Sequence, residues 1–210
     1  MNYLEPTYLI NPNNYDCIVS IGNKCPTAMI LHNLNIYKES YPFDSVPTTP
    51  KLILKYLIDN TTFFPKKNIV STDDKVWFGH FNLNDGYDTT IDTLKRRFER
   101  LFDILNQKKR ILFVYTSEAD CYNEMGNRYS DNYSDICKIK DYIIQKYNYD
   151  NFTIAAIHTN KHFEDDNIIK NYCINVPDIY LSDNMETHVP DTYDRYRYTL
   201  GLLMKKIFVV

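Results

Sequence analysis

One strand–helix–strand pattern constrains the fold of this chain more than any other feature. Residues 110–115 form a largely apolar run, residues 151–158 form a second, and an amphipathic helical pattern occupies 134–147 between them. A connection that contains a helix favours parallel pairing of the two strands through a right-handed crossover. The pattern therefore predicts a parallel β-sheet covered by helices.

A related strand–turn–helix unit lies near the N-terminus. Residues 16–21 (Asp-Cys-Ile-Val-Ser-Ile) are typical of a short buried strand, and Gly22-Asn23 is a turn signal. A helical pattern of apolar residues follows from Pro26, which suits the first position of a helix because its missing N–H is not needed there. Cys25 is therefore expected at the N-cap of this helix.

The remaining segments complete an alternating order of helices and strands. We expect helices over 49–58, 90–107 and 191–207, and strands over 75–81, 174–176 and 179–181. The predicted fold class is α/β: a single domain over residues 16–210, with a mainly parallel sheet and helices on both faces, after an irregular N-terminal arm over 1–15. The apolar C-terminal residues also suggest one module of a longer chain.

Composition excludes several function classes. Lys and Arg total 24 against 27 Asp and Glu, a net charge of −3, so no nucleic acid is expected as a partner. No apolar run reaches the roughly 18 residues of a membrane span, and no signal peptide is evident, so we expect no membrane contact and a cytoplasmic location. The bias toward Tyr (19) over Gly (5) is typical of AT-rich genomes. A large DNA virus is one such source, and the location would then be the host cytoplasm.

Neither a cofactor nor a metal is expected. The five cysteines are widely spaced and form no CxxC pair, so they lack the local signature of a zinc site or a redox dithiol. Gly22 stands alone, without the glycine-rich pattern of a nucleotide-binding loop.

Cys25 is the strongest candidate for a chemical role. A thiol at a helix N-terminus feels the partial positive charge of the helix, and Lys24 adds a second cation. Both effects favour the nucleophilic thiolate. The carboxyl end of a strand in an open α/β sheet is also the usual place for an active site. The alternative interpretation is a small, inert cysteine that serves as a structural cap.

A nucleophilic cysteine needs a base, and two histidines are candidates. His80 lies near the end of an expected strand, close to the polar residues Asn82, Asn84 and Asp85. His188 is the competitor, in a polar and acidic loop before the last helix. His32, His158 and His162 are interpreted as surface or structural residues.

The helix expected over 90–107 carries a basic face. Lys95, Arg96, Arg97 and Arg100 could bind a carboxylate or phosphate, because a guanidinium presents two parallel donors. Interleaved Glu99 and Asp103 equally allow ordinary ion pairing on a solvated surface.

Residues 16–117 resemble a bacterial and viral family described as papain-like cysteine peptidases. The likeness lies in the run Val-Ser-Ile-Gly-Asn-Lys-Cys at 19–25, the Tyr-Pro-Phe-Asp element at 41–44, His80-Phe81, the Arg-Arg-Phe-Glu-Arg-Leu helix at 96–101 and the strand at 111–114. The resemblance implies Cys25 as nucleophile and His80 as base. The third member stays open between Asp44, Asn82 and Asp85. Asn23 would help to build the oxyanion hole, since no Gln precedes Cys25 at the papain spacing.

One departure from papain-like enzymes is clear, because their cores use an antiparallel sheet and this chain predicts a parallel one.

The sequence leaves three hypotheses about function. The first is a cysteine hydrolase or acyl-transfer enzyme acting on a peptide or small acyl substrate, with Cys25, His80 and Asp44 catalytic and Asn23, Arg96 and Arg97 binding substrate. The second is a glycan- or acyl-modifying enzyme with His188 as base. The third is a non-catalytic interaction domain of a larger viral protein.

Overall fold

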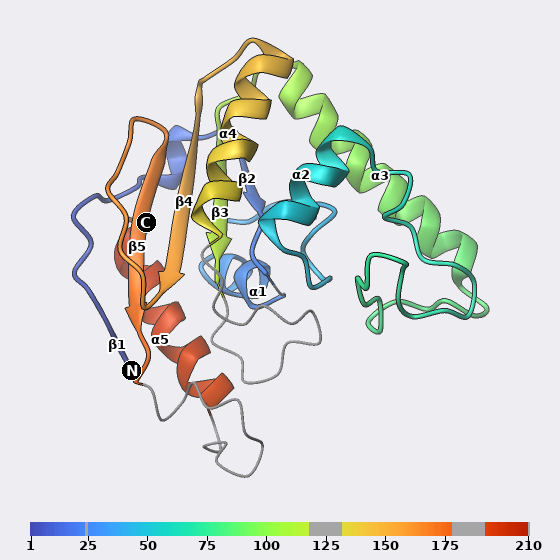
Figure 1. Cartoon of the computed structure of the whole chain (residues 1–210), viewed down its shortest axis with the longest axis horizontal. Helices are drawn as coiled ribbons and strands as arrows, with labels where there is room; N and C mark the ends of the chain where they lie inside the picture. Colours follow the sequence, from blue (N-terminus) through green and yellow to red (C-terminus); the bar gives the residue numbers. More distant parts are fainter. Residues whose placement is uncertain (24, 118–131, 178–191, 210) are drawn as a thin grey trace.

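The sheet has five strands in the order β1-β5-β4-β3-β2 (Figure 1). The computed structural model describes residues 1–23, 25–117, 132–177 and 192–209, and only the backbone at 192 and 193. Strands β2 to β5 run parallel to their neighbours, and β1 pairs antiparallel with β5 at one edge. The strands are β1 (Asn2–Tyr3), β2 (Cys17–Ser20), β3 (Ile111–Thr116), β4 (Phe152–Thr159) and β5 (Ile169–Asn175). The mainly parallel sheet that the sequence predicts is confirmed.

The central strands carry apolar side chains toward both faces of the sheet. All six residues of β3 are buried, as are seven of the eight residues of β4. Such strands need cover on both sides, which explains their continuous rather than alternating hydrophobicity. Val19 of β2 pairs with Phe113 of β3, which aligns the carboxyl ends of these two strands at one edge of the sheet.

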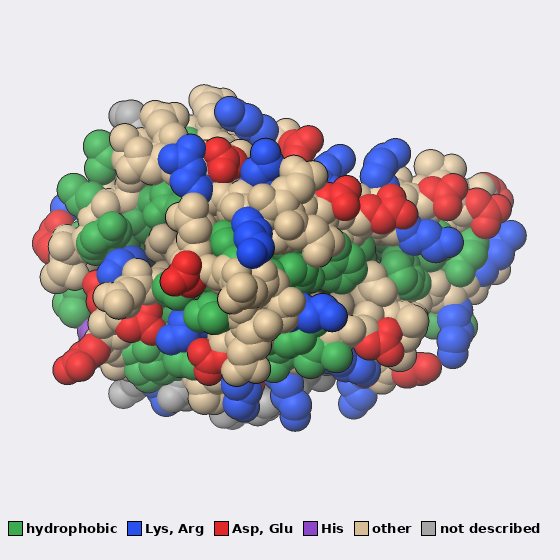
Figure 2. All heavy atoms as spheres, turned by 90° about the horizontal axis from the view of Figure 1, so that it is seen from above, with side chains coloured by type: hydrophobic (Ala, Val, Ile, Leu, Met, Phe, Trp, Pro, Cys, Tyr) green, Lys and Arg blue, Asp and Glu red, His purple; other side chains and the backbone are tan. Residues whose placement is uncertain are grey.

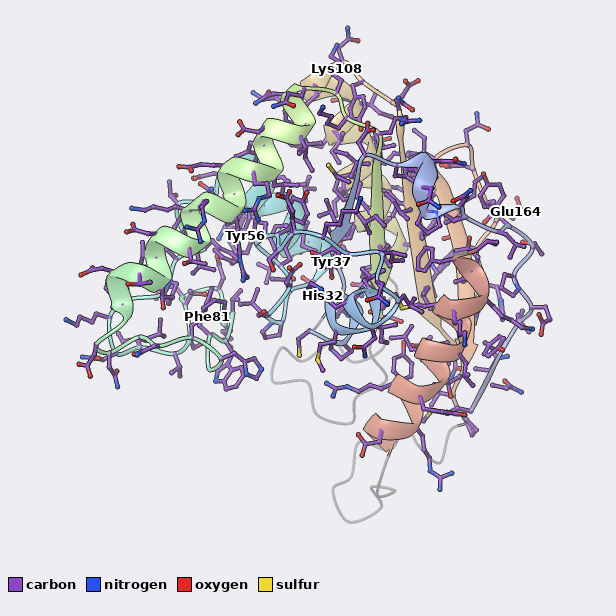
Figure 3. The ribbon with its side chains drawn as sticks, turned by 180° about the vertical axis from the view of Figure 1, so that it is seen from behind. His32, Tyr37, Tyr56, Phe81, Lys108 and Glu164 are labelled. Atoms are coloured by element: carbon purple, nitrogen blue, oxygen red, sulfur yellow. The ribbon has the colours of Figure 1, made fainter. Side chains whose placement is uncertain are left out.

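Helices cover both faces, as expected. α4 (Tyr133–Tyr147) and α2 (Pro50–Ile58) pack together on one face, whereas α5 (Thr192–Ile207) lies on the other beside α1 (Pro26–Asn33) (Figures 1 and 3). The long helix α3 (Tyr87–Asn106) extends beyond the β2 edge of the sheet (Figure 1). None of the helices in the described ranges is long and apolar enough to cross a membrane.

An aromatic cluster attaches α3 and the preceding loop to the rest of the domain. Phe63 packs edge-to-face against Phe98 of α3 at 4.9 Å between ring centroids and against Phe78 at 5.3 Å. Phe43 contacts Phe98 at 5.8 Å. Edge-to-face pairs of buried rings add stability beyond the area that they bury. The loop between α2 and α3 is therefore fixed by its own side chains.

The strand expected over 75–81 is wrong. This segment forms turns, and its only strand-like contact among the described residues is an isolated bridge between Ser71 and Trp77. Lys75 adopts a left-handed backbone with φ of 61°, which interrupts an extended chain. The apolar run Val76-Trp77-Phe78 was the misleading signal, because a loop that buries two of its side chains, here Val76 and Phe78, has the same composition.

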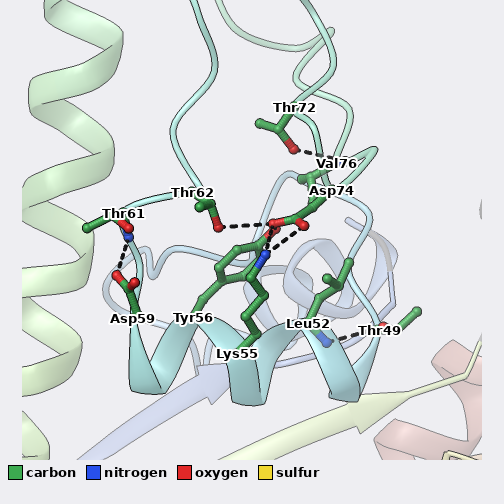
Figure 4. A network of polar contacts seen from close by, with 10 residues as sticks. All are labelled: Thr49, Leu52, Lys55, Tyr56, Asp59, Thr61, Thr62, Thr72, Asp74 and Val76. Atoms are coloured by element: carbon green, nitrogen blue, oxygen red, sulfur yellow. Dashed lines mark hydrogen bonds and ion pairs between the residues drawn. The ribbon is translucent and has the colours of Figure 1, made fainter.

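Asp74 ties this loop to α2 (Figure 4). Its carboxylate accepts hydrogen bonds from Lys55 at 2.6 and 2.7 Å, from Tyr56 at 2.9 Å and from Thr62 at 3.1 Å. The hydrogen bond from Lys55 is the main reason that the pKa of Asp74 lies below its usual value. Four hydrogen bonds from three side chains hold the Asp74 carboxylate, and with it the start of the turn segment, in place.

The other boundaries differ by small amounts. β5 begins at Ile169, five residues before the expected start at 174, and the strand expected over 179–181 lies outside the described residues. The helix after Cys25 ends at Asn33, and Asn35 turns the chain with a φ of 57°.

Candidate functional site

Cys25 lies at the junction between a parallel strand and a helix, as the sequence predicts. β2 ends at Ser20, and Pro26 is the first residue of α1. The Cys25 thiol is half-buried and makes no side-chain capping hydrogen bond. Its backbone is already helical, and its carbonyl accepts the Met29 N–H at 3.1 Å. The side chain therefore does not serve as a structural cap.

The turn before Cys25 is held tightly against β3. Asn23 donates its backbone N–H to the carbonyl of Thr116 at 3.0 Å. A side chain at Gly22 would place its Cβ 1.9 Å from the Thr27 hydroxyl oxygen, so only glycine fits there. The Thr27 and Thr116 hydroxyls are themselves hydrogen-bonded at 2.5 Å. This packing fixes the start of α1 at the carboxyl ends of β2 and β3.

Several buried polar side-chain atoms of this turn region and of α3 have no hydrogen-bond partner among the described residues. They are Ser20 Oγ, Asn23 Oδ1, Thr48 Oγ1 and Arg97 Nη1. Asn23 and Thr48 belong to one substructure, because the Thr48 N–H donates to the Asn23 carbonyl at 3.0 Å. Buried polar groups without partners are rare in folded proteins and each needs a reason. A polar ligand that binds beside the turn would supply the missing partners.

Asp44 lies in the same part of the fold and is only 4% exposed. Its Oδ1 accepts the Tyr37 hydroxyl at 2.5 Å, and its Oδ2 accepts the Tyr41 N–H at 2.9 Å. Burial raises the pKa of Asp44 to about 6, against these two hydrogen bonds and the positive charges of Arg97 and His32. No described histidine donates a hydrogen bond to Asp44. The carboxylate of Asp44 instead holds the Tyr37 side chain and the backbone at Tyr41 in place.

The basic residues of α3 separate into two groups. Arg97 is half-buried: its charge acts on Asp44, and its guanidinium lies 6.0 Å from the centroid of the Phe81 ring. Arg100 donates to the Ser40 carbonyl at 2.5 Å. Lys95 and Arg96 are exposed, on an arm of the molecule where Lys and Arg side chains are interspersed with Asp and Glu (Figure 2). Arg97 thus lies with the other candidate residues, and Arg96 lies on the solvated face.

His80 is exposed, and its ring contact is with Trp77, edge-on at 5.2 Å between centroids. No hydrogen bond links its ring to Cys25 or to Asp44 in the described part of the chain. Asn82, one of the other candidates for a third catalytic member, uses its side-chain oxygen to accept the Asn84 N–H at 3.1 Å. The pairing of Cys25 with His80 stays a prediction.

Two labelled regions of Figure 3 show how the candidate residues are distributed. His32 and Tyr37 lie together beside α1, and their rings meet edge-to-face at 4.8 Å. Phe81, the neighbour of His80, lies in the loop at the outer end of α3. Arg97 interacts with both regions, through Asp44 on one side and Phe81 on the other.

Sequence reasoning missed several members of this arrangement. Tyr37, His32, Ser20 and Thr48 were not singled out. Tyr37 is one of 19 tyrosines, so its identity carries little signal, and Ser20 occurs inside an apolar strand where a small polar residue attracts no attention. Lys24 and His188, which were assigned as the neighbouring cation and the alternative base, lie outside the described residues.

Comparisons with protein-family models, curated proteins and solved structures find no match to this chain. In the described ranges, no group of three or more His, Cys, Asp and Glu side chains is placed to hold a metal ion. The assignment of function therefore depends on the residues beside the β2–α1 turn.

Proposed function

We propose that the chain is a cysteine hydrolase or related acyl-transfer enzyme, with Cys25 as the nucleophile. One observation carries the proposal: a half-buried, uncapped thiol starts a helix at the carboxyl end of a parallel strand, two residues after Asn23, whose buried side-chain oxygen has no partner. A structural cysteine would be expected to cap, pack or pair. The start of a helix, with its unpaired backbone N–H groups, is where such a thiol can meet an electrophilic carbonyl.

The proposed reaction has two steps. The Cys25 sulfur attacks the carbonyl carbon of an ester or amide, the bond to the leaving group breaks, and the leaving group takes up the proton that the thiol lost. Water then adds to the resulting thioester, which releases the acid and restores the thiol. The first N–H groups of α1 and the Asn23 side chain are the nearest candidates to stabilise the oxyanion.

The other site residues take supporting roles in this proposal. His80 is the proposed base, and it would move the proton between Cys25 and the leaving group. Arg97 has one buried nitrogen free to bind a carbonyl or carboxylate of the substrate, while Arg96 would contribute from the solvated face. Asp44 holds Tyr37 and the 41–44 turn against this region. A peptide or small acyl substrate in the cytoplasm fits these roles.

Turnover of a panel of p-nitrophenyl esters and fluorogenic peptide amides tests the proposal. Cys25→Ser should lower kcat at least about 100-fold while leaving the unfolding midpoint unchanged, since the thiol makes no structural hydrogen bond. Cys137→Ser, at another half-buried thiol, is the matched control and should retain activity. His80→Ala and His188→Ala, measured side by side, identify the base. Equal activity of the wild type and Cys25→Ser would overturn the proposal.

A further inference from the structure

A groove of about 430 Å³ lies between α1 and α5, on the face of the sheet opposite α4. Its volume lies within the range of small-molecule sites. Its lining residues are Pro26, Met29, Ile30, Asn33 and Leu34 from α1, and Arg197, Tyr198, Gly201, Leu202 and Lys205 from α5. None of these ten residues is acidic.

The groove exposes large apolar side chains. Met29 is 52% exposed, Tyr198 is 70% exposed and Leu202 is 41% exposed. Tyr198 and Leu202 are four residues apart on α5, so they form one stripe along the helix. A stripe of this kind, opposite exposed Met29, leaves apolar surface in water that an apolar ligand would cover.

Gly201 makes the surface concave. A Cβ built on Gly201 would have no heavy atom within 4 Å, although the residue lies inside a helix where glycine is unfavourable by about 1 kcal/mol relative to alanine. Packing therefore does not require glycine at this position. The absent side chain keeps the groove open.

The charge of the groove selects an anion. Lys205 is exposed and forms no ion pair with a described residue, whereas the adjacent Lys206 is held by Glu5 at 2.5 Å. Arg197 adds a second positive charge to the lining. Because the described lining residues include Lys205 and Arg197 but no acidic residue, the complementary ligand has both an alkyl chain and a negative group.

We propose that the groove binds an anionic amphiphile, namely a medium-length alkyl or acyl chain that ends in a carboxylate. The chain would lie against Met29 and Leu202, and the carboxylate would interact with Lys205. A groove of about 430 Å³ suits an inserted chain better than a protein partner, because a stable protein interface needs about 800 Å² from each side. The proposal identifies a binding site that the acyl-transfer chemistry does not itself require.

The position of the groove also suggests a substrate class. Pro26 lines the groove and directly follows Cys25, so the groove reaches the residue next to the candidate nucleophile. The acyl group of an amphiphilic substrate would then occupy the groove. This second step rests on the proposed function, whereas binding of the amphiphile does not.

Titration with dodecanoate, dodecanol and dodecylammonium, each below its micelle concentration, tests the binding. With ¹³C-methyl methionine labelling, dodecanoate should shift the Met29 signal and leave that of buried Met204 in place, because only Met29 lines the groove. Dodecanoate should bind about tenfold more tightly than dodecylammonium, since the two cations attract one head group and repel the other. Equal affinity for all three compounds, or no shift at Met29, would overturn the proposal.

Two variants locate the ligand. Gly201→Leu places a side chain in the groove at a position where a Cβ meets no neighbour, and it raises helix propensity, so the variant should fold and weaken dodecanoate binding about tenfold or more. Lys205→Glu should remove the preference for dodecanoate over dodecylammonium. Lys146→Glu, on α4 at the opposite face, is the matched charge reversal and should change nothing. Unchanged dodecanoate binding in Gly201→Leu would refute the site. If the Met29 signal shifted with protein concentration in the absence of ligand, the groove would be a self-association surface instead.

The same variants separate this proposal from the proposed function. If dodecanoate binds but no ester is turned over, the proposed binding site is supported and the proposed hydrolase activity is overturned. If esters are turned over while Gly201→Leu leaves KM for short and long acyl chains unchanged, the hydrolase activity is supported, and the groove is not the site that binds the acyl chain of the substrate.

Discussion

The Tyr37 hydroxyl donates a hydrogen bond of 2.5 Å to the Asp44 carboxylate, which is almost fully buried. The pair links the segment after α1 to the 41–44 turn, and the charge of Arg97 from α3 acts on the same carboxylate. The segment 37–44 and helix α3, which are distant in the sequence, therefore meet at one ionisable group. The stability of this region should depend on pH.

Asp44 should make folding less favourable as the pH rises. Burial raises its pKa from 3.8 to about 6, so the native state binds a proton that the unfolded state has already lost between these values. The contribution of Asp44 is fully present below about pH 4 and is lost as the pH rises through 6, a change of about 3 kcal/mol. The difference in unfolding free energy between the wild type and Asp44→Asn, measured by urea denaturation from pH 4 to 7, should fall by about this amount. A difference that stays constant with pH would contradict the assignment.

Tyr37→Phe should destabilise the protein more at pH 7 than at pH 4. At pH 7 the variant removes a donor to a charged carboxylate, which costs about 1.5–3 kcal/mol, and at pH 4 the acceptor is largely neutral. Tyr142→Phe is the control, because the Tyr142 hydroxyl donates to the neutral Leu57 carbonyl at 3.0 Å. Its effect on the unfolding free energy should not vary over this pH range. If the loss of unfolding free energy depended on pH equally in the two variants, the hydrogen bond from Tyr37 to Asp44 would not be its source.

Two glycine substitutions should have opposite effects on stability. Gly22→Ala forces a Cβ onto the Thr27 side chain, with a clash at 1.9 Å, and should lower the unfolding free energy by about 2 kcal/mol or more. Gly201→Ala meets no neighbour inside α5 and should raise it by about 1 kcal/mol. Thermal unfolding of both variants beside the wild type checks the contrast. A tolerated Gly22→Ala would mean that the turn before Cys25 is not closely packed on β3.

The fold was largely predictable from the sequence, because apolar runs and helical periodicity record burial directly. The β3–α4–β4 unit and the β2–turn–α1 unit both form as expected, and Cys25 lies where Pro26 and the Gly22-Asn23 turn place it. The strand expected over 75–81 does not form, because a short apolar run shows which side chains are suited to burial and not whether a neighbouring strand is present to pair with it.

The candidate site was predictable only in part. Residue type and local spacing identified Cys25 and Arg97, whereas Asn23 and Asp44 were suggested by the resemblance alone, and the fold brings the charge of Arg97 to Asp44. The roles of Tyr37 and Thr48 depend on contacts between segments that no local pattern encodes. The same limit applies to the partner of Cys25, because His80 lies 55 positions away and its ring contacts Trp77.

The thiols should differ strongly in reactivity. Burial raises the pKa of Cys17, Cys137 and Cys173, which lowers the fraction of thiolate at neutral pH. Cys25 is the one of these four that starts a helix, so it should be the first of them to react. Brief treatment with iodoacetamide at pH 7, followed by peptide mass spectrometry, gives the order.

The rate of alkylation at Cys25 in the folded protein, compared with the same rate in His80→Ala, tests the central claim most directly. The account predicts that Cys25 reacts at least about tenfold faster than Cys17 and Cys137, and that His80→Ala removes most of this advantage without changing the unfolding midpoint. A Cys25 that reacts no faster than the other half-buried thiols would contradict the account and leave the residue as an ordinary cysteine at the start of a helix.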